Sequence, residues 1–154
     1  MSPGIEQRIQ RIEDELAIGQ LRARYCHLLD DMEWEAFVGL FTEDGVFEGL
    51  NKVQGRDALM AFFSQDVPRV AQRFWHFCTN GTIDIDGDIA TGRISMEYIS
   101  VTDGVSYVSA GHYDDVCVRE AGQWKFKSRK ITFYFYSPLS EGYTGTRPAS
   151  SVFE

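Results

Sequence analysis

Apolar residues recur every three or four positions over residues 5–29, which is the period of one face of an α-helix. The positions that carry this face are Ile5, Ile9, Ile12, Leu16, Leu21, Tyr25, Leu28 and Leu29. The pattern predicts a helix of about 25 residues, roughly 37 Å long. A helix of that length can lie across a whole β-sheet.

A second, shorter helix is predicted directly after the first. Its apolar positions are Trp34, Phe37, Val38, Leu40 and Phe41. Asp30 or Asp31 can supply the N-terminal cap, because a short carboxylate side chain accepts hydrogen bonds from the first backbone N–H groups. We expect this helix to end at Thr42, and a turn over 43–45 to lead into a short strand over 46–48.

A third helix is expected over 56–63, after Gly55 and before Pro68. Beyond it the pattern changes to runs rich in β-branched and aromatic residues, at about 72–85, 88–102, 105–119 and 123–136. The dipeptides between these runs are Asp86-Gly87, Asp103-Gly104 and Ala121-Gly122. Asp-Gly between two such runs is a strong signal for a β-hairpin.

Three helices followed by four long strands in a meander predict an α+β fold, with the helices packed on one face of a curved antiparallel sheet around a pocket. We expect one domain over 1–139, because no repeat, linker or low-complexity segment divides the chain. The tail over 140–154 is rich in Ser, Gly, Thr and Pro, yet it retains Tyr143, Val152 and Phe153. A disordered tail has little need of such side chains, so we expect this one to cover the pocket mouth or contact a neighbouring subunit.

Composition supports a single core with a ring-lined cavity. A chain of 154 residues buries about 70% of its unfolded surface, which suits one domain. Eleven Phe, seven Tyr and three Trp make up 14% of the chain. Rings in that number must line a core, a cavity or an interface.

Charge and hydropathy exclude several classes of protein. A net charge of −8 disfavours a nucleic-acid partner, because binding to phosphates depends on clustered Lys and Arg. No apolar run approaches the ~20 residues that a membrane-spanning helix needs. Residues 1–20 are polar and charged, unlike a signal peptide, so we expect a soluble cytoplasmic protein.

The three cysteines, Cys26, Cys78 and Cys117, are odd in number and include no CxxC pair. This spacing favours neither a disulfide framework nor a zinc site. We expect free, reduced thiols. A nucleophilic role for Cys78 is the alternative.

His76 is the main candidate for chemistry. It lies in an apolar predicted strand, where alternation puts it on one face with Phe74 and Cys78, and puts Trp75 and Phe77 on the other. An imidazole has an unperturbed pKa of about 6.5, which suits proton transfer at neutral pH.

A buried imidazole also needs a hydrogen-bond partner. Asp30, at the end of the first helix, is the expected partner, and Asp31 is the alternative. Taken alone, the pattern also fits a structural histidine whose hydrogen bonds are satisfied in the core.

The chain resembles the nuclear-transport-factor-2-like superfamily, and in particular its polyketide cyclase-like branch, which includes scytalone dehydratase, bile-acid 7α-dehydratase and hexachlorocyclohexane dehydrochlorinase. The resemblance covers residues 10–139. The segments that carry it are Tyr25-Cys26-His27-Leu28-Leu29-Asp30, Trp34, Leu40-Phe41-Thr42-Glu43-Asp44, Gly55-Arg56, Trp75-His76-Phe77-Cys78-Thr79-Asn80, Gly111-His112-Tyr113-Asp114 and Gly122-Gln123-Trp124-Lys125 through Arg129. It implies a cone-like sheet wrapped around the long helix and two shorter ones.

The resemblance also implies a mechanism. In this branch an Asp on the first helix orients a His on the strand after the third helix, and the His removes a proton from the substrate. Asp30 and His76 match these positions, and Tyr25 matches a Tyr that the dehydratases carry five residues before the Asp. The dehydrochlorinase would have a Lys in this region, so the match favours an oxygen leaving group or a carbonyl over a halide.

Each of the three residues then has an expected role. Asp30 fixes the tautomer of His76 and stabilises the imidazolium. Tyr25 donates to the oxygen that gains charge. No metal and no organic cofactor is expected.

The remaining pocket residues follow from strand parity and from the resemblance. Met96 and Tyr98 face the same side as His76 if the hairpin turn pairs positions 76 and 98. Arg129 stands at a position from which some members of the branch reach the pocket, and a surface ion pair is the alternative. The expected substrate-binding set is Trp34, Phe74, Cys78, Met96, Tyr98, Tyr113, Arg129, Ile131 and Phe133. His27 is expected to be structural, and His112 is expected to face the other surface of the sheet.

The leading hypothesis is therefore a cofactor-independent lyase, acting by dehydration or retro-aldol cleavage on a small hydrophobic hydroxy compound, aromatic or polycyclic. An isomerase or cyclase is the first alternative, and a non-catalytic binding or assembly domain is the second. Because Trp75 and Phe77 are too apolar for solvent, an oligomer is expected. The resemblance implies a trimer in preference to a dimer, because the dehydratase and dehydrochlorinase relatives are trimers.

Overall fold

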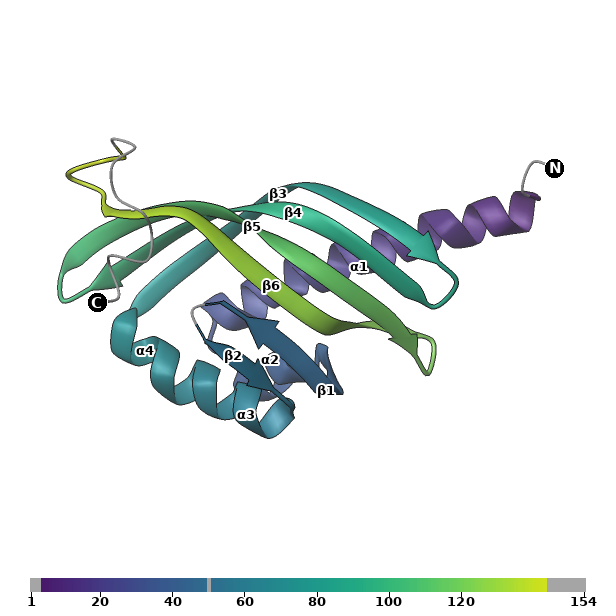
Figure 1. Ribbon diagram of the computed structural model, residues 1–154, viewed down its shortest axis with the longest axis horizontal. Helices are drawn as coiled ribbons and strands as arrows, with labels where there is room; N and C mark the ends of the chain where they lie inside the picture. The colour runs from purple at the N-terminus through teal and green to yellow at the C-terminus, as the bar shows by residue number, and fades with distance from the viewer. Residues whose placement is uncertain (1–3, 50, 144–154) are drawn as a thin grey trace.

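The computed structural model describes residues 4–49 and 51–143, which form a curved sheet with helices on its concave side (Figure 1). In chain order the elements are α1 (Ile5–Asp30), α2 (Trp34–Val38), β1 (Phe41–Glu48), β2 (Lys52–Gln54), α3 (Arg56–Ala61), the π-helical turn η1 (Phe62–Asp66), α4 (Val67–Val70), β3 (Arg73–Asp86), β4 (Ile89–Thr102), β5 (Val105–Glu120) and β6 (Gln123–Pro138). The α+β fold expected from the sequence is confirmed.

The sheet has the strand order β2-β1-β6-β5-β4-β3. Strands β3 to β6 form the predicted antiparallel meander, whereas β1 pairs with β6 in parallel. Two of the three hairpin turns have positive φ at both central residues, at Asp103-Gly104 and Ala121-Gly122. Those backbone angles match the right-handed twist of the flanking strands.

The register between β3 and β4 depends on a β-bulge. The turn is one residue later than predicted, at residues 87–88, because Asp86 pairs with Ile89. The pairing shifts by one residue between Thr79 and Thr82, where Asn80 has φ 55°. An extra residue on one strand reverses the parity beyond it. The observed turn alone would pair His76 with Ile99, and the one-residue shift at the bulge brings Tyr98 opposite His76 instead, as expected.

The second helix is shorter than predicted, and residues 41–45 lie in β1 instead of the helix end and turn that the pattern suggested. The helix ends early because the following residues pair with a distant strand. The N–H of Phe126 on β6 donates to the carbonyl of Leu40 at 2.9 Å. The third helical segment runs on through Pro68 to Val70. Pro68 lies in the first turn of α4, a position where the missing N–H is tolerated.

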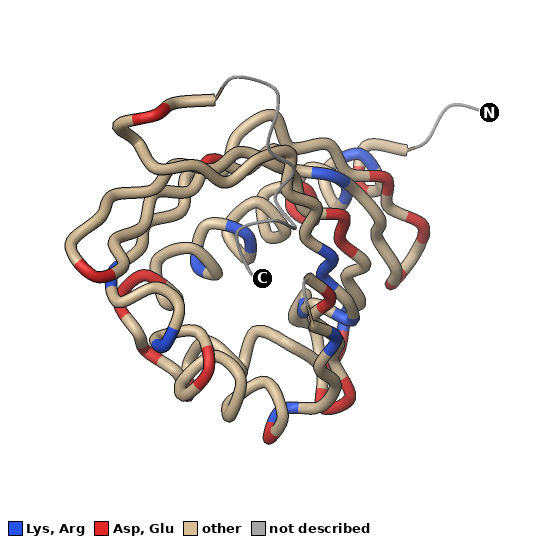
Figure 2. Tube along the Cα trace, turned by 60° about the vertical axis from the view of Figure 1, so that its left-hand side comes forward, with Lys and Arg blue, Asp and Glu red and all other residues tan. Residues whose placement is uncertain are grey.

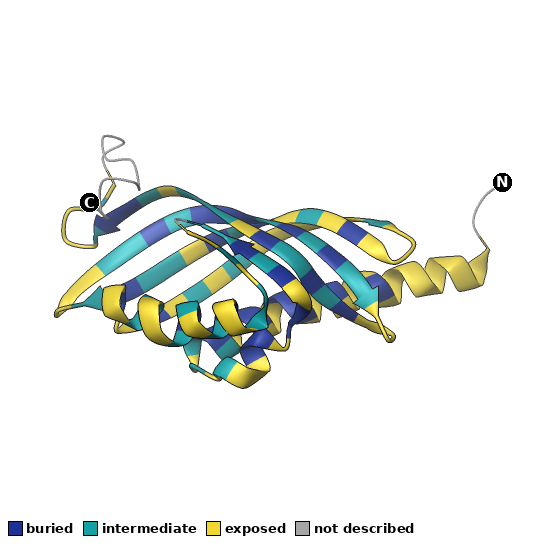
Figure 3. Ribbon diagram, turned by 60° about the horizontal axis from the view of Figure 1, so that its bottom comes forward, coloured by how far each residue is buried: buried dark blue, intermediate teal, exposed yellow. Residues whose placement is uncertain are grey.

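The sheet covers one face of α1 from Asp14 to the end of the helix. Its buried positions include Ile18, Leu21, Tyr25 and Leu29. The predicted apolar face is wrong for the first half, where the side chains of Ile5, Ile9, Ile12 and Leu16 are 50–66% exposed. Figures 1 and 3 show the N-terminal turns of α1 extending beyond the sheet.

The outer face of β3 is also open. Trp75 is 46% and Phe77 is 52% exposed, and both alternate with residues that face α1. The described start of the tail lies on the outer side as well, where Tyr143 stacks on Phe135 with ring centroids 4.3 Å apart. Val152 and Phe153, which were expected to cover the pocket or a neighbour, lie outside the described residues.

Charged residues of both signs are interspersed along the chain trace (Figure 2). Ion pairs such as Arg93–Asp114, at 2.7 Å, link neighbouring strands on the outer face. Within the described residues, no helix combines the length and the hydropathy required to cross a bilayer.

Candidate active site

Asp30 and His76 meet where the end of α1 lies against β3. The Nδ1 atom of His76 is 2.6 Å from Oδ1 of Asp30, and the backbone N–H of His76 donates to Oδ2 at 2.9 Å. A carboxylate only accepts hydrogen bonds, so Nδ1 is the nitrogen that donates in this contact. The hydrogen bond predicted from the sequence is present, and in the neutral tautomer that fits it Nε2 is the nitrogen with the lone pair.

Aromatic neighbours hold the imidazole in place. Its ring centroid is 4.8 Å from that of Tyr98 and 5.8 Å from that of Phe74. The side chains of His76 and Asp30 are 8% and 14% exposed. The pair is therefore largely shielded from bulk water, where its electrostatic interaction would be weaker.

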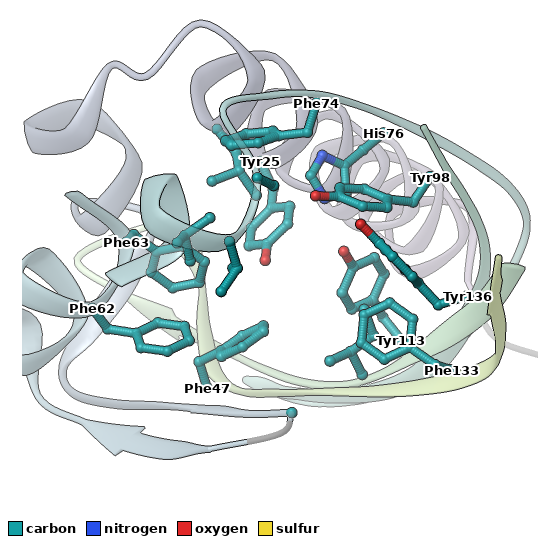
Figure 4. Close-up of a pocket in the computed structure, with 16 residues that line it drawn as sticks. Tyr25, Phe47, Phe62, Phe63, Phe74, His76, Tyr98, Tyr113, Phe133 and Tyr136 are labelled. Carbon is teal, nitrogen blue, oxygen red and sulfur yellow. The ribbon is translucent and has the colours of Figure 1, made fainter. Parts of the chain in front are cut away.

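The pair lies at the wall of an aromatic pocket with a volume of about 130 Å³ (Figure 4). The rings that line it come from α1, β1, η1 and the strands β3 to β6. They belong to Tyr25, Phe47, Phe62, Phe63, Phe74, His76, Tyr98, Tyr113, Phe133 and Tyr136. Figure 4 shows the hydroxyl groups of the four tyrosines turned towards the middle of the pocket.

Tyr25 has the most unusual environment of the four tyrosines. Its side chain is completely buried, and its hydroxyl has no hydrogen-bond partner among the described residues. Burial raises the pKa of Tyr25, and the positive charge of Arg129 and the nearby Tyr113 hydroxyl only partly oppose this effect. The phenol is therefore neutral at physiological pH and has a free O–H to donate.

A buried ion triad lies behind Tyr25 and Tyr113. Asp115 accepts from Arg22 at 2.9 Å and from Arg129 at 2.7 and 2.9 Å. The Arg129 guanidinium carbon is 4.2 Å from the centroid of the Tyr25 ring and 4.3 Å from that of Tyr113. Two arginines face one carboxylate, so the triad is net positive and favours negative charge that develops near these phenols.

The structure places most of the expected substrate-binding residues at the pocket. Phe74, Tyr98, Tyr113, Ile131 and Phe133 line it, together with Tyr25 and His76. These contacts establish position, and the catalytic and binding roles remain predictions.

Four of the expected residues do not line the pocket. Met96 is buried in the core, and Cys78, its cross-strand partner, faces α1. The Arg129 side chain is fully buried behind the tyrosines, where it forms an ion pair with Asp115. Arg129 therefore neither lines the pocket nor forms a surface ion pair. Trp34 packs against the core at the start of α2.

Sequence reasoning missed several residues at the site. Phe62 and Phe63 come from the helical segment that closes the pocket, and no sequence signal shows where that segment docks. Tyr136 reaches the pocket because β6 changes register opposite Ala110 and Gly111. The position of Asp115 could have been predicted, because it lies two residues after Tyr113 on the same strand and therefore faces the same side of the sheet.

The other two histidines lie away from the pocket. His112 faces the outer surface, as expected, where it lies 2.8 Å from the Tyr134 hydroxyl and 3.2 Å from Asp114. His27 is exposed on α1. Among the described residues, no three or more His, Cys, Asp and Glu side chains are grouped so that they could hold a metal ion.

Comparison with known proteins agrees with the fold. A family model described as a SnoaL-like domain matches residues 10–130. No curated protein matches the chain in sequence. Solved structures of similar fold are numerous.

Three of these structures illustrate the range. A proposed scytalone dehydratase from Novosphingobium aromaticivorans is 24% identical over 84% of this chain and 89% of its own, with a TM-score of 0.76. A protein of unknown function from Mycobacterium tuberculosis is 29% identical over 99% and 90%, with a TM-score of 0.76. Hexachlorocyclohexane dehydrochlorinase LinA-type3 from Novosphingobium barchaimii is 20% identical over 92% and 99%, with a TM-score of 0.79.

Proposed function

Because the chain belongs to the SnoaL-like domain family, within the nuclear-transport-factor-2-like superfamily, we propose that it is a cofactor-independent lyase. Its substrate is a small hydrophobic hydroxy compound, and its reaction is a dehydration or a retro-aldol cleavage. The observation that carries this proposal is the 2.6 Å contact between His76 and Asp30 at the wall of an aromatic pocket. Fold neighbours named as a dehydratase and a dehydrochlorinase support the reaction class.

In the proposed mechanism His76 is the general base. In a dehydration its Nε2 atom removes a proton from a substrate carbon next to a carbonyl group; in a retro-aldol cleavage it removes the proton of the hydroxyl group, and the carbon–carbon bond to the carbonyl-bearing fragment breaks to give an enolate. In both cases the ring becomes an imidazolium. Asp30 stabilises this cation through the Nδ1 contact and keeps the ring in the required tautomer. A base positioned in this way typically contributes 10²–10⁴-fold to the rate, an order-of-magnitude range.

Tyr25 acts at the oxygen end of the substrate. As the carbon loses its proton, negative charge moves to the carbonyl oxygen or to the departing hydroxyl. The unpartnered phenol of Tyr25 donates a hydrogen bond there, and the net positive triad behind it strengthens the effect. In the dehydration the proton held by His76 returns to the leaving hydroxyl, so that one molecule of water is released and the enzyme is regenerated.

The pocket limits the size of the substrate. A dry apolar cavity of about 150 Å³ accommodates benzene, and this pocket has about 130 Å³. The pocket therefore holds a group of about one aromatic ring. A polycyclic substrate would extend beyond it towards solvent.

We also propose that the protein is a homotrimer. Trp75 and Phe77 expose their rings side by side on the outer face of β3, where a neighbouring subunit would bury them. Light scattering is expected to give three times the 17.5 kDa chain mass. A particle of single-chain mass at micromolar concentration would contradict this proposal.

The function is tested by incubating the purified protein with aromatic and polycyclic hydroxy-carbonyl compounds without any added cofactor. Mass spectrometry of the products separates the possible reactions, because dehydration removes the mass of one water and retro-aldol cleavage gives two carbonyl fragments. An isomerase leaves the mass unchanged. Turnover that gives only isomers, or that appears only after nicotinamide or metal is added, would overturn the proposal.

A further inference from the structure

Two of the three thiols meet beside the candidate dyad, although 52 positions separate them in the sequence. The Sγ atoms of Cys26 on α1 and Cys78 on β3 are 3.5 Å apart. Cys117 is completely buried, and burial raises the pKa of its thiol to about 12. We propose that Cys26 and Cys78 form a reversible dithiol–disulfide site that is oxidised by hydrogen peroxide.

A groove gives small oxidants access to this pair. The groove lies between α1 and β3 and has a volume of about 530 Å³. Cys26 and Cys78 both line it, with Ala23 on the helix side and Thr79 on the strand side. Among the described residues, His76 alone lines both this groove and the aromatic pocket. Peroxide can therefore reach the thiols without entering the pocket.

The contact between the thiols activates one of them. Cys26 donates its S–H to Cys78, and this hydrogen bond lowers the pKa of Cys78, helped by the charges of Arg129 and Arg22 against the effect of burial. The pKa of Cys26 is raised, chiefly because its thiol is the donor. The thiolate is the reactive form of cysteine, and Cys78 is also less buried than Cys26, so Cys78 reacts first.

The oxidation then proceeds in two steps. The Cys78 thiolate attacks one oxygen of hydrogen peroxide, the O–O bond breaks, and the departing hydroxide is protonated to water, which leaves Cys78 as a sulfenic acid. The Cys26 sulfur next attacks the Cys78 sulfur, the S–O bond breaks, and a second water leaves with the Cys26 proton. The two thiols lose two electrons in total to the peroxide, and a reducing dithiol restores them by exchange.

Formation of the disulfide changes the geometry next to the dyad. An S–S bond is about 2.05 Å long, so the two sulfur atoms must approach by roughly 1.5 Å. Cys26 is one helical turn before Asp30, and Cys78 is two residues after His76 on the same strand face. The bond draws α1 and β3 together beside the 2.6 Å contact, and this lowers turnover. That consequence rests on the proposed function, whereas the dithiol site does not.

The site is tested by peptide mapping of the whole protein. Hydrogen peroxide is added to the folded wild type, free thiols are alkylated, and the chain is digested with trypsin. The three cysteines fall in separate peptides, 25–52, 74–93 and 94–119. We expect 25–52 linked to 74–93 within one chain, 94–119 alkylated, and full reversal by dithiothreitol. Three alkylated thiols, or a link that involves 94–119, would overturn the proposal.

A matched set of variants separates the two reactive thiols. Cys117→Ala keeps the pair and is expected to form the same link. Cys26→Ser leaves the Cys78 sulfenic acid without its resolving thiol, so dimedone should label peptide 74–93. If dimedone does not label peptide 74–93 in this folded variant, Cys78 is not the thiol that peroxide oxidises first, and the proposed order of the two steps is overturned.

A second probe works on the unmutated protein. Phenylarsine oxide bridges two neighbouring thiols, and it is expected to block Cys26 and Cys78 together, with one arsenic bound per chain. If all three thiols stay reactive towards alkylation, the sulfur atoms do not lie within bridging distance and the proposal fails.

Turnover measured on the reduced and oxidised forms tests the effect on the dyad. Lower turnover that recovers on reduction is expected. Unchanged turnover with the disulfide formed would overturn the coupling and leave the proposed function standing. Absence of turnover in both forms would count against the proposed function, while peptide mapping would still decide the dithiol site.

Discussion

Replacing Asp30 with Asn tests the role of the carboxylate with little change in shape. The amide can still accept the backbone N–H of His76, which Asp30 binds at 2.9 Å, so the end of α1 should stay in place. The amide cannot stabilise an imidazolium, and its NH₂ group can donate to Nδ1 and leave the ring proton on Nε2, the wrong nitrogen. We therefore expect a folded protein with a poor base.

The size of the loss follows from the contact distance and its environment. The N–O contact is 2.6 Å, and the two side chains are 8% and 14% exposed. Unit charges about 4 Å apart interact by about 4 kcal/mol at an effective dielectric constant of about 20. Since about 1.4 kcal/mol corresponds to a factor of ten in rate, kcat should fall about 10³-fold.

The assay is steady-state turnover as a function of pH, with Asp31→Asn as the matched control. Asp31 is the next residue in the chain and is exposed. We expect kcat to fall in Asp30→Asn across the whole pH range with little change in KM, and Asp31→Asn to behave as the wild type. Equal kcat in the two variants, with both correctly folded by circular dichroism, would refute the role of Asp30.

Three further changes have defined outcomes. Tyr25→Phe removes an unpartnered buried hydroxyl, so kcat should fall about 10²-fold while the melting temperature holds or rises, and normal kcat would exclude Tyr25 as the donor. Asp115→Asn leaves Arg22 and Arg129 without their counter-charge, so urea titration should show a loss of about 3–5 kcal/mol; a loss below about 1 kcal/mol, the range of exposed pairs, would contradict the buried triad. The double change Trp75→Ser and Phe77→Ser should give a smaller particle in light scattering, and an unchanged mass would place the subunit contact elsewhere.

Local patterns predicted most of the secondary structure because the residues that determine it are close in sequence. The turns at Asp103-Gly104 and Ala121-Gly122 occur where glycine permits the backbone angles they require. The long helix followed from apolar spacing. Spacing does not show what covers a helix face, and for that reason the exposure of Ile5 and Leu16 was not predicted.

Register was harder to predict than the strands themselves. The pairing of His76 with Tyr98 depends on the bulge at Asn80 as well as on the turn. Without the bulge, the observed turn would pair His76 with Ile99 and put Tyr98 on the other face. The parallel pairing of β1 with β6 joins segments far apart in sequence, and no local signal encodes it.

At the candidate site, too, some features followed from the local sequence and others depended on contacts between residues far apart in the chain. The contact between His76 and Asp30 was predictable because a buried imidazole requires a partner, and the family resemblance matched Asp30 to that position. The approach of Cys26 to Cys78, and of Arg22 to Asp115, joins side chains 52 and 93 positions apart. Such contacts depend on how α1 lies across the sheet, and spacing rules for cysteines and charges do not contain that information.

The most direct test of the proposed mechanism compares the turnover of wild type, His76→Ala and His112→Ala in buffer that contains a metal chelator and no nicotinamide. His112 is a matched control, because it is also buried and hydrogen-bonded but lies on the outer face of the sheet. We predict full activity in the wild type and His112→Ala, and a loss of about 10²–10⁴-fold in His76→Ala. Near-wild-type turnover in His76→Ala, or a wild type that needs an added metal or nicotinamide, would contradict the proposal that His76 is the base.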